Sequence, residues 1–149
     1  MKQQPVFCKI VPDTDGRIAD WVSACLGFQK NWEDDFLTLG FELDGRLIGG
    51  LIYHNIRLGR DVWWTIYTTD KRWCSRRILK VIFSLAFDVL KVKRISLLVN
   101  IDNEPCIKLV EKLGFVREGL LRGYRDDGAD CYFYGMLQSE NKWKGKTNE

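Results

Sequence analysis

The sequence has a single histidine, His54, and its five cysteines form no Cys-x-x-Cys pair. A structural zinc site draws on such pairs, so these counts argue against a bound metal. An odd number of scattered cysteines is also untypical of a disulfide framework, and we expect reduced thiols. The first nine residues lack an apolar signal core, and no stretch is long and uncharged enough to span a bilayer. We therefore expect a cytoplasmic protein without a membrane segment.

Acidic residues are scarce in one part of the chain, because Asp88 is the only acid between Lys71 and Arg94. The net charge of +3 is nevertheless too mild to indicate nucleic-acid binding by itself. No internal repeat or low-complexity linker is present, and 149 residues suffice for one hydrophobic core. We expect a single domain over residues 1–138, followed by a polar tail, 139–149, that frays.

The segment 70–90 begins as a basic loop and continues as an apolar run. Within it, polar residues recur at four-residue spacing: Arg76, Lys80, Ser84 and Asp88. Only a helix places them on one narrow stripe, so the pattern predicts a helix buried on most of its circumference, with Ser75 as its N-cap. The first-turn amides would then face the same volume as Arg76 and Arg77, which favours an anion such as phosphate. Taken alone, however, the pattern is more typical of a core helix with a solvated basic N-terminus than of an anion site.

The remaining elements are predicted from apolar periodicity and turn residues. Helices are expected over 18–25, capped by Asp13, Thr14 or Asp15, and from Asn103 to Gly114. We expect strands at 6–11, 37–43, 46–53, 61–69, 94–100, 115–125 and 129–138. The order β-α-β-β-β-α-β-α-β-β indicates an α/β (α+β) fold, a mixed, mostly antiparallel sheet with helices on both faces. The polar segment 29–35 is either a wall of a cleft or a solvated turn.

The segment 103–115, NEPCIKLVEKLGF, carries the most specific pattern in the chain. It resembles the Asn-x-x-Ser/Ala-x-x-x-Leu/Tyr-Glu-Lys-x-Gly-Phe segment of the GCN5-related N-acetyltransferase (GNAT) superfamily. The continuation 116–122 and the ending from Asp130 to Leu137 are similar to the branch that acetylates ribosomal-protein N-termini and to its small relatives. The similarity extends from about Trp63 to Leu137, and before that only the order of elements matches.

The resemblance implies an N-acetyltransferase that uses acetyl-CoA and no metal. An amine of the acceptor (a protein N-terminus, a lysine or a small amine) would attack the thioester directly. The strand from Asp61 is expected to splay from its parallel neighbour, so that amides near Ile66, Tyr67 and Thr68 polarise the thioester carbonyl. Tyr67, Thr68 and Thr69 would pair with the pantetheine arm, and Asn103 would cap its helix and also reach that arm.

The chain departs from the family pattern in the phosphate loop. Where the family has Gln/Arg-x-x-Gly-x-Gly/Ala, this chain has Lys71, Arg72, Trp73, Cys74, Ser75 and Arg76. A Cβ at both glycine places should crowd the phosphates. Either Lys71, Arg72, Arg76 and Arg77 replace amide contacts with charge-assisted ones, or the pocket is degraded and the fold is used otherwise. We favour the first because the helix still starts in the right place.

The proton donor and the base are open. Many family members have a tyrosine where this chain has Val110, whereas the branch resembled here has serine at the position of Cys106. The Cys106 thiol is either the acid that protonates the leaving thiolate or a small buried hydrophobe. Asp61, at the start of its strand, is either the base or a turn residue, and an amine already neutral by desolvation would need no strong base.

The acceptor side is expected at Tyr53, His54, Tyr124 and Tyr134. The acceptor itself is not encoded in a recognisable signal, and the protein is expected to be a monomer or a homodimer. Basic loops interleaved with aromatic residues also suit nucleic acid, which we do not favour. The alternatives are a non-catalytic domain of this fold that binds nucleic acid or a protein, and an enzyme that modifies a nucleobase amine.

Overall fold

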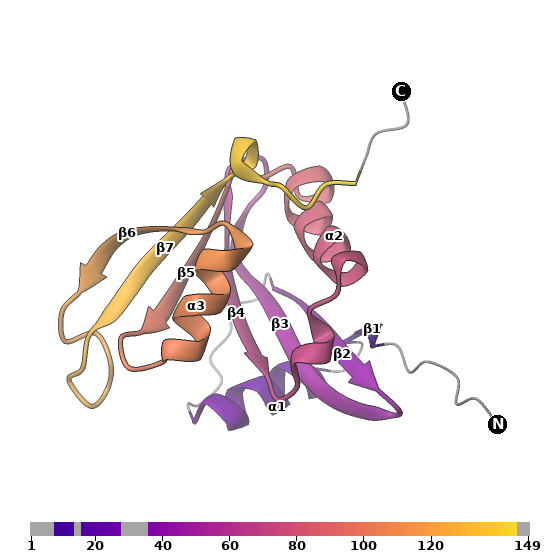
Figure 1. The fold of residues 1–149 in the computed structure, drawn as a ribbon, viewed down its shortest axis with the longest axis horizontal. Coiled ribbons are helices and arrows are strands. Elements are labelled where there is room, and N and C mark those ends of the chain that lie inside the picture. Colours follow the sequence, from indigo (N-terminus) through magenta and orange to yellow (C-terminus); the bar gives the residue numbers. More distant parts are fainter. Residues whose placement is uncertain (1–7, 14–15, 28–35, 146–149) are drawn as a thin grey trace. The chain divides into compact units, whose positions relative to one another are not determined.

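The structure, a computed structural model, describes residues 8–13, 16–27 and 36–145. Its elements are β1 (Lys9–Pro12), α1 (Arg17–Leu26), β2 (Leu37–Leu43), β3 (Arg46–Arg57), β4 (Asp61–Thr68), α2 (Arg76–Ser84), β5 (Arg94–Asn100), α3 (Glu104–Leu113), β6 (Val116–Leu121) and β7 (Cys131–Leu137) (Figure 1). The predicted order of strands and helices is therefore confirmed. The segment 29–35 lies outside the described residues, as do Thr14 and Asp15.

The chain divides into two compact units. Unit 1 comprises Met1–Ile56 and Trp64–Ile82, and unit 2 comprises Arg57–Trp63 and Phe83–Glu149, so the boundaries fall inside β3, β4 and α2. The expectation of one domain over residues 1–138 stays a prediction. In the described part of the chain, no helix has the length and apolar composition needed to cross a bilayer.

The strands form one seven-stranded sheet in the order β1-β2-β3-β4-β5-β7-β6. β1 with β2, β2 with β3, β5 with β7 and β6 with β7 are antiparallel, whereas β4 and β5 run parallel. The predicted mixed, mostly antiparallel sheet is confirmed. The β2–β3 hairpin turns at Asp44 (φ 54°) and Gly45 (φ 78°), the left-handed pair that a two-residue turn requires.

In unit 1, α1 packs on one face of the sheet. Both carboxylate oxygens of Asp13 accept from first-turn amides, of Ile18 (3.2 Å) and Ala19 (3.0 Å), so Asp13 takes the predicted capping role. A Cβ on Gly40 would lie 2.7 Å from Ile18 Cδ1, and one on Gly50 would lie 2.5 Å from a Val22 methyl. These two glycines therefore allow the close approach of α1 to the strands.

The opposite face of unit 1 is covered by the segment that leads into α2. Lys71–Trp73 forms a 3-10 turn, and the buried Trp73 ring stacks on Phe41 with centroids 5.1 Å apart. Since Phe41 follows Gly40 in β2, its side chain points away from α1. Helical segments thus cover both faces of the strands of unit 1.

The predicted single helix of 76–90 changes geometry part of the way along. α2 ends at Ser84 and continues as a π-helical turn, Leu85–Val89, in which the Leu90 amide donates to the Leu85 carbonyl at 2.9 Å. Phe83, Ala86, Phe87 and Leu90 remain buried through this turn, whereas Val89 is exposed. Their spacing is compatible with either geometry, so the sequence pattern does not distinguish them.

In unit 2, α3 buries Ile107, Val110 and Leu113, and it ends at Gly114 (φ 111°) as predicted. The expectation that the tail 139–149 frays stays a prediction. Residues Gln138–Glu140 form a 3-10 turn. The indole of Trp143 then donates to the Leu113 carbonyl at 2.7 Å, because the end of α3 leaves this carbonyl without a helical partner.

Candidate functional site

The end of β4 belongs to unit 1 and carries the main chain expected to meet a thioester. The Thr69 amide donates to the Ile48 carbonyl of β3 at 2.7 Å, so it is not available to a ligand. Main-chain groups of successive strand residues point to opposite sides, so those of Ile66 and Thr68 point away from β3. The Tyr67 ring packs edge-on against Trp21 of α1, with centroids 5.7 Å apart. Ile66 and Thr68 are thus the residues whose main chain suits the predicted role.

The start of β4 belongs to unit 2 and pairs with β5. The parallel ladder joins Asp61 to Arg94, Val62 to Ile95 and Trp63 to Ser96. Ile66 and Thr68 lie beyond these paired residues. The expected splay of the strand from its parallel neighbour stays a prediction.

The loop after β4 is shaped by Asp70. Its carboxylate accepts from the Arg72 amide at 3.0 Å and caps the 3-10 turn, and it also accepts from the Arg72 guanidinium at 2.6 Å. These hydrogen bonds, from the side chain first and then from the amide, lower the pKa of Asp70 to about 2. Arg72 is therefore engaged within its own loop.

The two glycine places of the phosphate loop are occupied without left-handed backbone. Cys74 has φ −88°, which any residue adopts, and Arg76 is the first residue of α2. Ser75 caps the helix as predicted, since its hydroxyl accepts from the Ile78 amide at 3.2 Å. A guanidinium nitrogen of Arg77 donates to the Cys8 carbonyl at 2.9 Å, and Lys71, Arg76 and Arg77 are all exposed.

In unit 2, the start of α3 carries two of the predicted site residues, Asn103 and Cys106. The Asn103 side chain accepts from the Cys106 amide at 3.3 Å and caps the helix, as predicted. Cys106 is half-buried, and this burial raises the pKa of its thiol. Val110, at the place where many family members have tyrosine, is buried.

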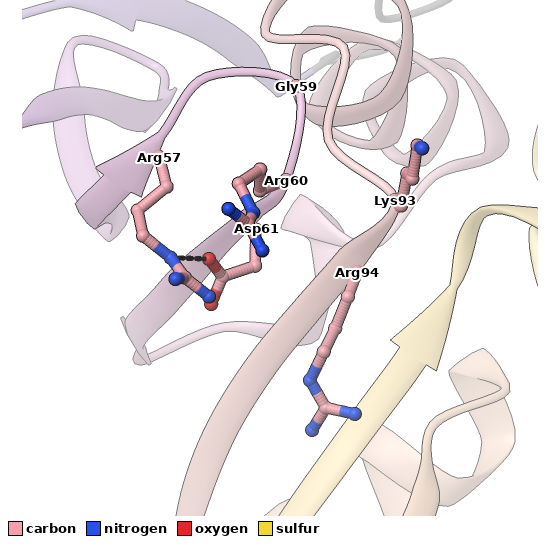
Figure 2. Close-up of a pocket in the computed structure, with 6 residues that line it drawn as sticks. All are labelled: Arg57, Gly59, Arg60, Asp61, Lys93 and Arg94. Carbon is pink, nitrogen blue, oxygen red and sulfur yellow. Dashed lines mark hydrogen bonds and ion pairs between the residues drawn. The ribbon is translucent and has the colours of Figure 1, made fainter.

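Asp61, the candidate base, is ion-paired with Arg57 in the described structure. The Arg57 Nε–H donates to its carboxylate (Figure 2). Asp61 is also the first residue of β4, whereas Ile66 and Thr68 lie in the last three residues of that strand. The structure therefore favours a turn-stabilising role for this carboxylate.

Two residues expected on the acceptor side, Tyr53 and His54, have internal partners instead. Tyr53 is 0% exposed and its hydroxyl donates to the Ile82 carbonyl at 2.7 Å. Burial raises the pKa of Tyr53 well above its usual value, so it stays a neutral phenol. His54 Nε2 lies 2.8 Å from Thr65 Oγ1, and burial lowers the pKa of the imidazole. Tyr53 is thus a core residue that cannot reach an acceptor as the side chains stand.

The other two residues expected on the acceptor side, Tyr124 and Tyr134, differ in their exposure. Tyr124 is exposed and open to a ligand, whereas Tyr134 is buried. The Tyr134 hydroxyl donates to a Glu111 carboxylate oxygen and accepts from Arg117 Nε at 3.0 Å. The Arg117 guanidinium also lies 3.7 Å from the centroid of the Tyr132 ring. Tyr134 therefore links β7 to α3 by a hydrogen bond, and its side chain is not exposed to a substrate.

Sequence reasoning missed this cluster of Glu111, Arg117, Tyr132 and Tyr134. The cluster could have been found only from the register of the last hairpin, which places Arg117 opposite Tyr134. That register has an irregularity between Arg117 and Gly119, which alternation along the sequence does not reveal.

The comparisons with known proteins agree with this architecture. "Uncharacterized N-acetyltransferase p20" of Bacillus licheniformis is 35% identical over 86 residues, which are 56% of this chain and 44% of that protein. "Putative ribosomal N-acetyltransferase YdaF" of Bacillus subtilis is 25% identical over 117 residues, 74% of this chain and 63% of that protein. The matches thus span less than two thirds of either curated relative. No protein-family model matches the chain.

Among solved structures, the spermidine/spermine N-acetyltransferase SpeG of Vibrio cholerae superposes with a TM-score of 0.73 at 18% identity, over 89% of this chain and 94% of SpeG. At that identity the match shows the fold, which is the GNAT fold. The fold match and the two sequence matches, both to relatives named as N-acetyltransferases, confirm the resemblance to the GNAT superfamily. The resemblance to the ribosomal branch agrees with one of those names.

Proposed function

We propose that this protein is an acetyl-CoA-dependent N-acetyltransferase that acts on a primary amine. The names of its relatives and the GNAT fold support the reaction class. The observation that carries the proposal is the start of α2, which Ser75 caps directly after the loop that follows β4. The first-turn amides of such a helix have no intrahelical partners and attract phosphate oxygens.

The residues of unit 1 fit a phosphate-bearing cofactor. Cys74 and Arg76 hold the loop without glycine, and neither is strained. We assign the phosphate contacts to the first-turn amides of α2 together with the exposed side chains of Lys71, Arg72, Arg76 and Arg77. Arg72 and Arg77 would exchange their present contacts, with Asp70 and the Cys8 carbonyl, for contacts to phosphate. Acetyl-CoA, when bound, supplies an acetyl group activated as a thioester.

The main chain of Ile66 and Thr68 is assigned to orient the carbonyl of that thioester. The acceptor amine must be neutral to attack, and Asp61 is occupied by Arg57. We therefore assign no proton transfer to Asp61 and infer that the amine loses its proton by desolvation before the attack.

The proton for the leaving thiolate is assigned to Cys106 Sγ. Because burial raises the pKa of this thiol, it keeps its proton at neutral pH and can donate it. Replacement by alanine, Cys106→Ala, should lower kcat about 100-fold, which is the low end for a general acid. Cys106→Ser should retain more activity, and its rate should persist at high pH, where the wild-type rate falls as the thiol ionises.

Steady-state rates of both variants across pH 6–11 check this assignment. Cys25→Ala is the matched control, because Cys25 is an exposed thiol on α1. If Cys106→Ala turns over within twofold of the wild type, Cys106 is a small buried residue without a part in the reaction.

The acceptor is proposed to be a peptide N-terminus rather than a polyamine. One relative is named for ribosomal N-acetylation, whereas the solved SpeG structures are named for spermidine and spermine.

The test incubates the full chain with acetyl-CoA and a panel of N-terminal peptides, lysine peptides, spermidine and small amines. Mass spectrometry of the acceptors should show acetylation, with CoA released in equal amount. An acetylated polyamine and unmodified peptides would contradict the acceptor class but not the reaction.

A second candidate is a non-catalytic domain that binds nucleic acid through its basic loops, favoured by the side chains at both glycine places. For that function we would expect no turnover and no stabilisation by CoA. Binding to an oligonucleotide should weaken steeply with added salt.

A further inference from the structure

A hollow of about 410 Å³ in unit 2 has no part in the function proposed above. It is lined by the turn between β3 and β4 and by the chain that enters β5: Arg57, Gly59, Arg60, Asp61, Lys93 and Arg94 (Figure 2). The residues assigned to acetyl-CoA on β4 lie at the other end of that strand.

Main-chain hydrogen bonds hold the two segments of the hollow together. The Arg60 amide donates to the Arg57 carbonyl at 2.9 Å and closes the turn, in which Gly59 has the left-handed φ of 75°. The Gly59 amide donates to the Leu90 carbonyl at 3.1 Å, and the Lys93 amide to the Arg60 carbonyl at 2.9 Å. The basic side chains are therefore carried by a fixed frame that does not depend on their own contacts.

Two of the four cations that line the hollow are neutralised. Arg57 pairs with Asp61. Arg94 donates to both carboxylate oxygens of Glu118, and its Nε–H donates to Ser96 Oγ at 2.8 Å. In the described part of the chain, Arg60 and Lys93 have no ion-pair partner, and both are exposed. The hollow thus has an excess of two positive charges.

We propose that this hollow binds a phosphate monoester. A monoester carries a charge of −1.5 to −2 near neutral pH, which matches the excess, and it offers three acceptor oxygens. The Arg60 guanidinium can donate two parallel hydrogen bonds to such a group, and the Lys93 ammonium adds a point charge. A phosphodiester has half that charge, and a carboxylate has only two oxygens in one plane, so both match the hollow less well.

The test is a titration of the full, ¹⁵N-labelled chain with glycerol 2-phosphate, followed by amide chemical shifts. The expected result is a saturable shift confined to the segments 57–61 and 91–94. Dimethyl phosphate, a diester, should bind at least tenfold more weakly. Arg60→Gln and Lys93→Gln should each weaken binding of the monoester at least fivefold without changing the fold, because these side chains are exposed.

Lys91→Gln is the matched control. It removes the same charge from the same segment, at an exposed residue that does not line the hollow, and should change affinity less than twofold. An equal loss in this variant, or shifts spread without saturation over other basic residues, would overturn the proposal. Tighter binding of an RNA oligonucleotide through Arg60 and Lys93 would also overturn it, in favour of a nucleic-acid contact.

A final experiment uses coenzyme A as a competitor, because coenzyme A carries a phosphate monoester of its own. Saturating CoA should leave the glycerol 2-phosphate shifts at Arg60 and Lys93 unchanged. Competition between the two ligands at these amides would show that the hollow is part of the cofactor site and would overturn the proposal, whereas a protein that fails to bind CoA would contradict only the proposed function.

Discussion

At the scale of single residues, the loop after β4 depends on the contact between Asp70 and Arg72. The pKa of Asp70 is lowered to about 2, chiefly by the Arg72 side chain and next by the Arg72 amide. The unfolded chain has an ordinary carboxyl pKa of about 3.9. This contact therefore stabilises the fold at all pH values above about 4, and its contribution is lost as the pH falls from about 4 to 2.

An NMR titration of the Asp70 carboxyl carbon should give a midpoint near pH 2. In Arg72→Gln we expect the midpoint to rise part of the way to about 3.9, because the amide at position 72 still donates. Arg46→Gln is the control: Arg46 makes only the smallest contribution to the shift, so the midpoint should barely move. A midpoint near 4 in the wild type would exclude the ion pair.

Residues whose role follows from local geometry were predictable from the sequence. Ser75 and Asn103 cap helices because a short polar side chain before an apolar run has few other uses, and Gly114 ends a helix for the same kind of reason. Tyr53 and Tyr134 were assigned to the acceptor side but are buried. Alternation along a strand tells which residues share a face, but it does not tell which face a helix covers.

At the scale of elements, the start of α2 depends on its cap. Ser75→Ala removes the acceptor of the Ile78 amide and should cost about 1 kcal/mol of unfolding free energy, while Ser75→Asn restores the cap and should cost a few tenths. Urea denaturation measures both. Ser84→Ala is the matched control, because that hydroxyl makes only a surface hydrogen bond to Asp88. Equal stability of the alanine and asparagine variants would show that the hydroxyl does not cap the helix.

The packing of β5 against β7 depends on the absence of a side chain at Gly135. A Cβ there would lie 2.5 Å from one guanidinium nitrogen of Arg94 and 2.8 Å from its central carbon. Because these atoms are the far end of a flexible side chain, Gly135→Ala should displace the guanidinium from Glu118 and Ser96 and cost about 1 kcal/mol, the worth of those contacts. In an Arg94→Ala background the same change should cost less than about 0.5 kcal/mol, because the clash is gone.

Urea denaturation of the four proteins in this cycle measures the coupling between positions 94 and 135. Gly119→Ala is the control on the neighbouring strand, since a Cβ there meets nothing within 4 Å. Additive effects of the two changes would mean that Arg94 does not lie across Gly135.

At the scale of the whole molecule, the order of elements and the type of sheet were predictable, because each element carries its own periodicity and turn residues. The hairpin at Asp44 and Gly45 is an example, since its left-handed backbone is written in the residue types. The hydrogen bond from the Trp143 indole to the Leu113 carbonyl was not predictable, because the two residues are 30 positions apart and nothing in the polar tail indicates the contact. The frame around Arg60 and Lys93 escaped notice for a related reason, since its hydrogen bonds join segments distant in sequence.

The proposed cofactor makes a prediction for the stability of the whole chain. CoA at a hundred times its dissociation constant should add about 2.7 kcal/mol to the unfolding free energy, since it binds only the folded state. For a protein of this size that corresponds to a rise in Tm of roughly 5–10 °C. Thermal unfolding at increasing CoA concentration measures both the rise and the dissociation constant.

The double variant Lys71→Gln/Arg76→Gln separates the proposed phosphate contacts from a general effect of charge. Each contact to a charged oxygen is worth about 1.5 kcal/mol or more, so the double variant should bind CoA at least tenfold more weakly. Lys80→Gln paired with Lys108→Gln removes the same charge from exposed helix positions and should change affinity less than twofold. If CoA raises Tm equally in both double variants, the cofactor is held by other residues. If CoA does not raise the Tm of the wild type at all, the chain has kept the GNAT fold without binding the cofactor. The side chains at the two glycine places of the phosphate loop would then be the physical reason.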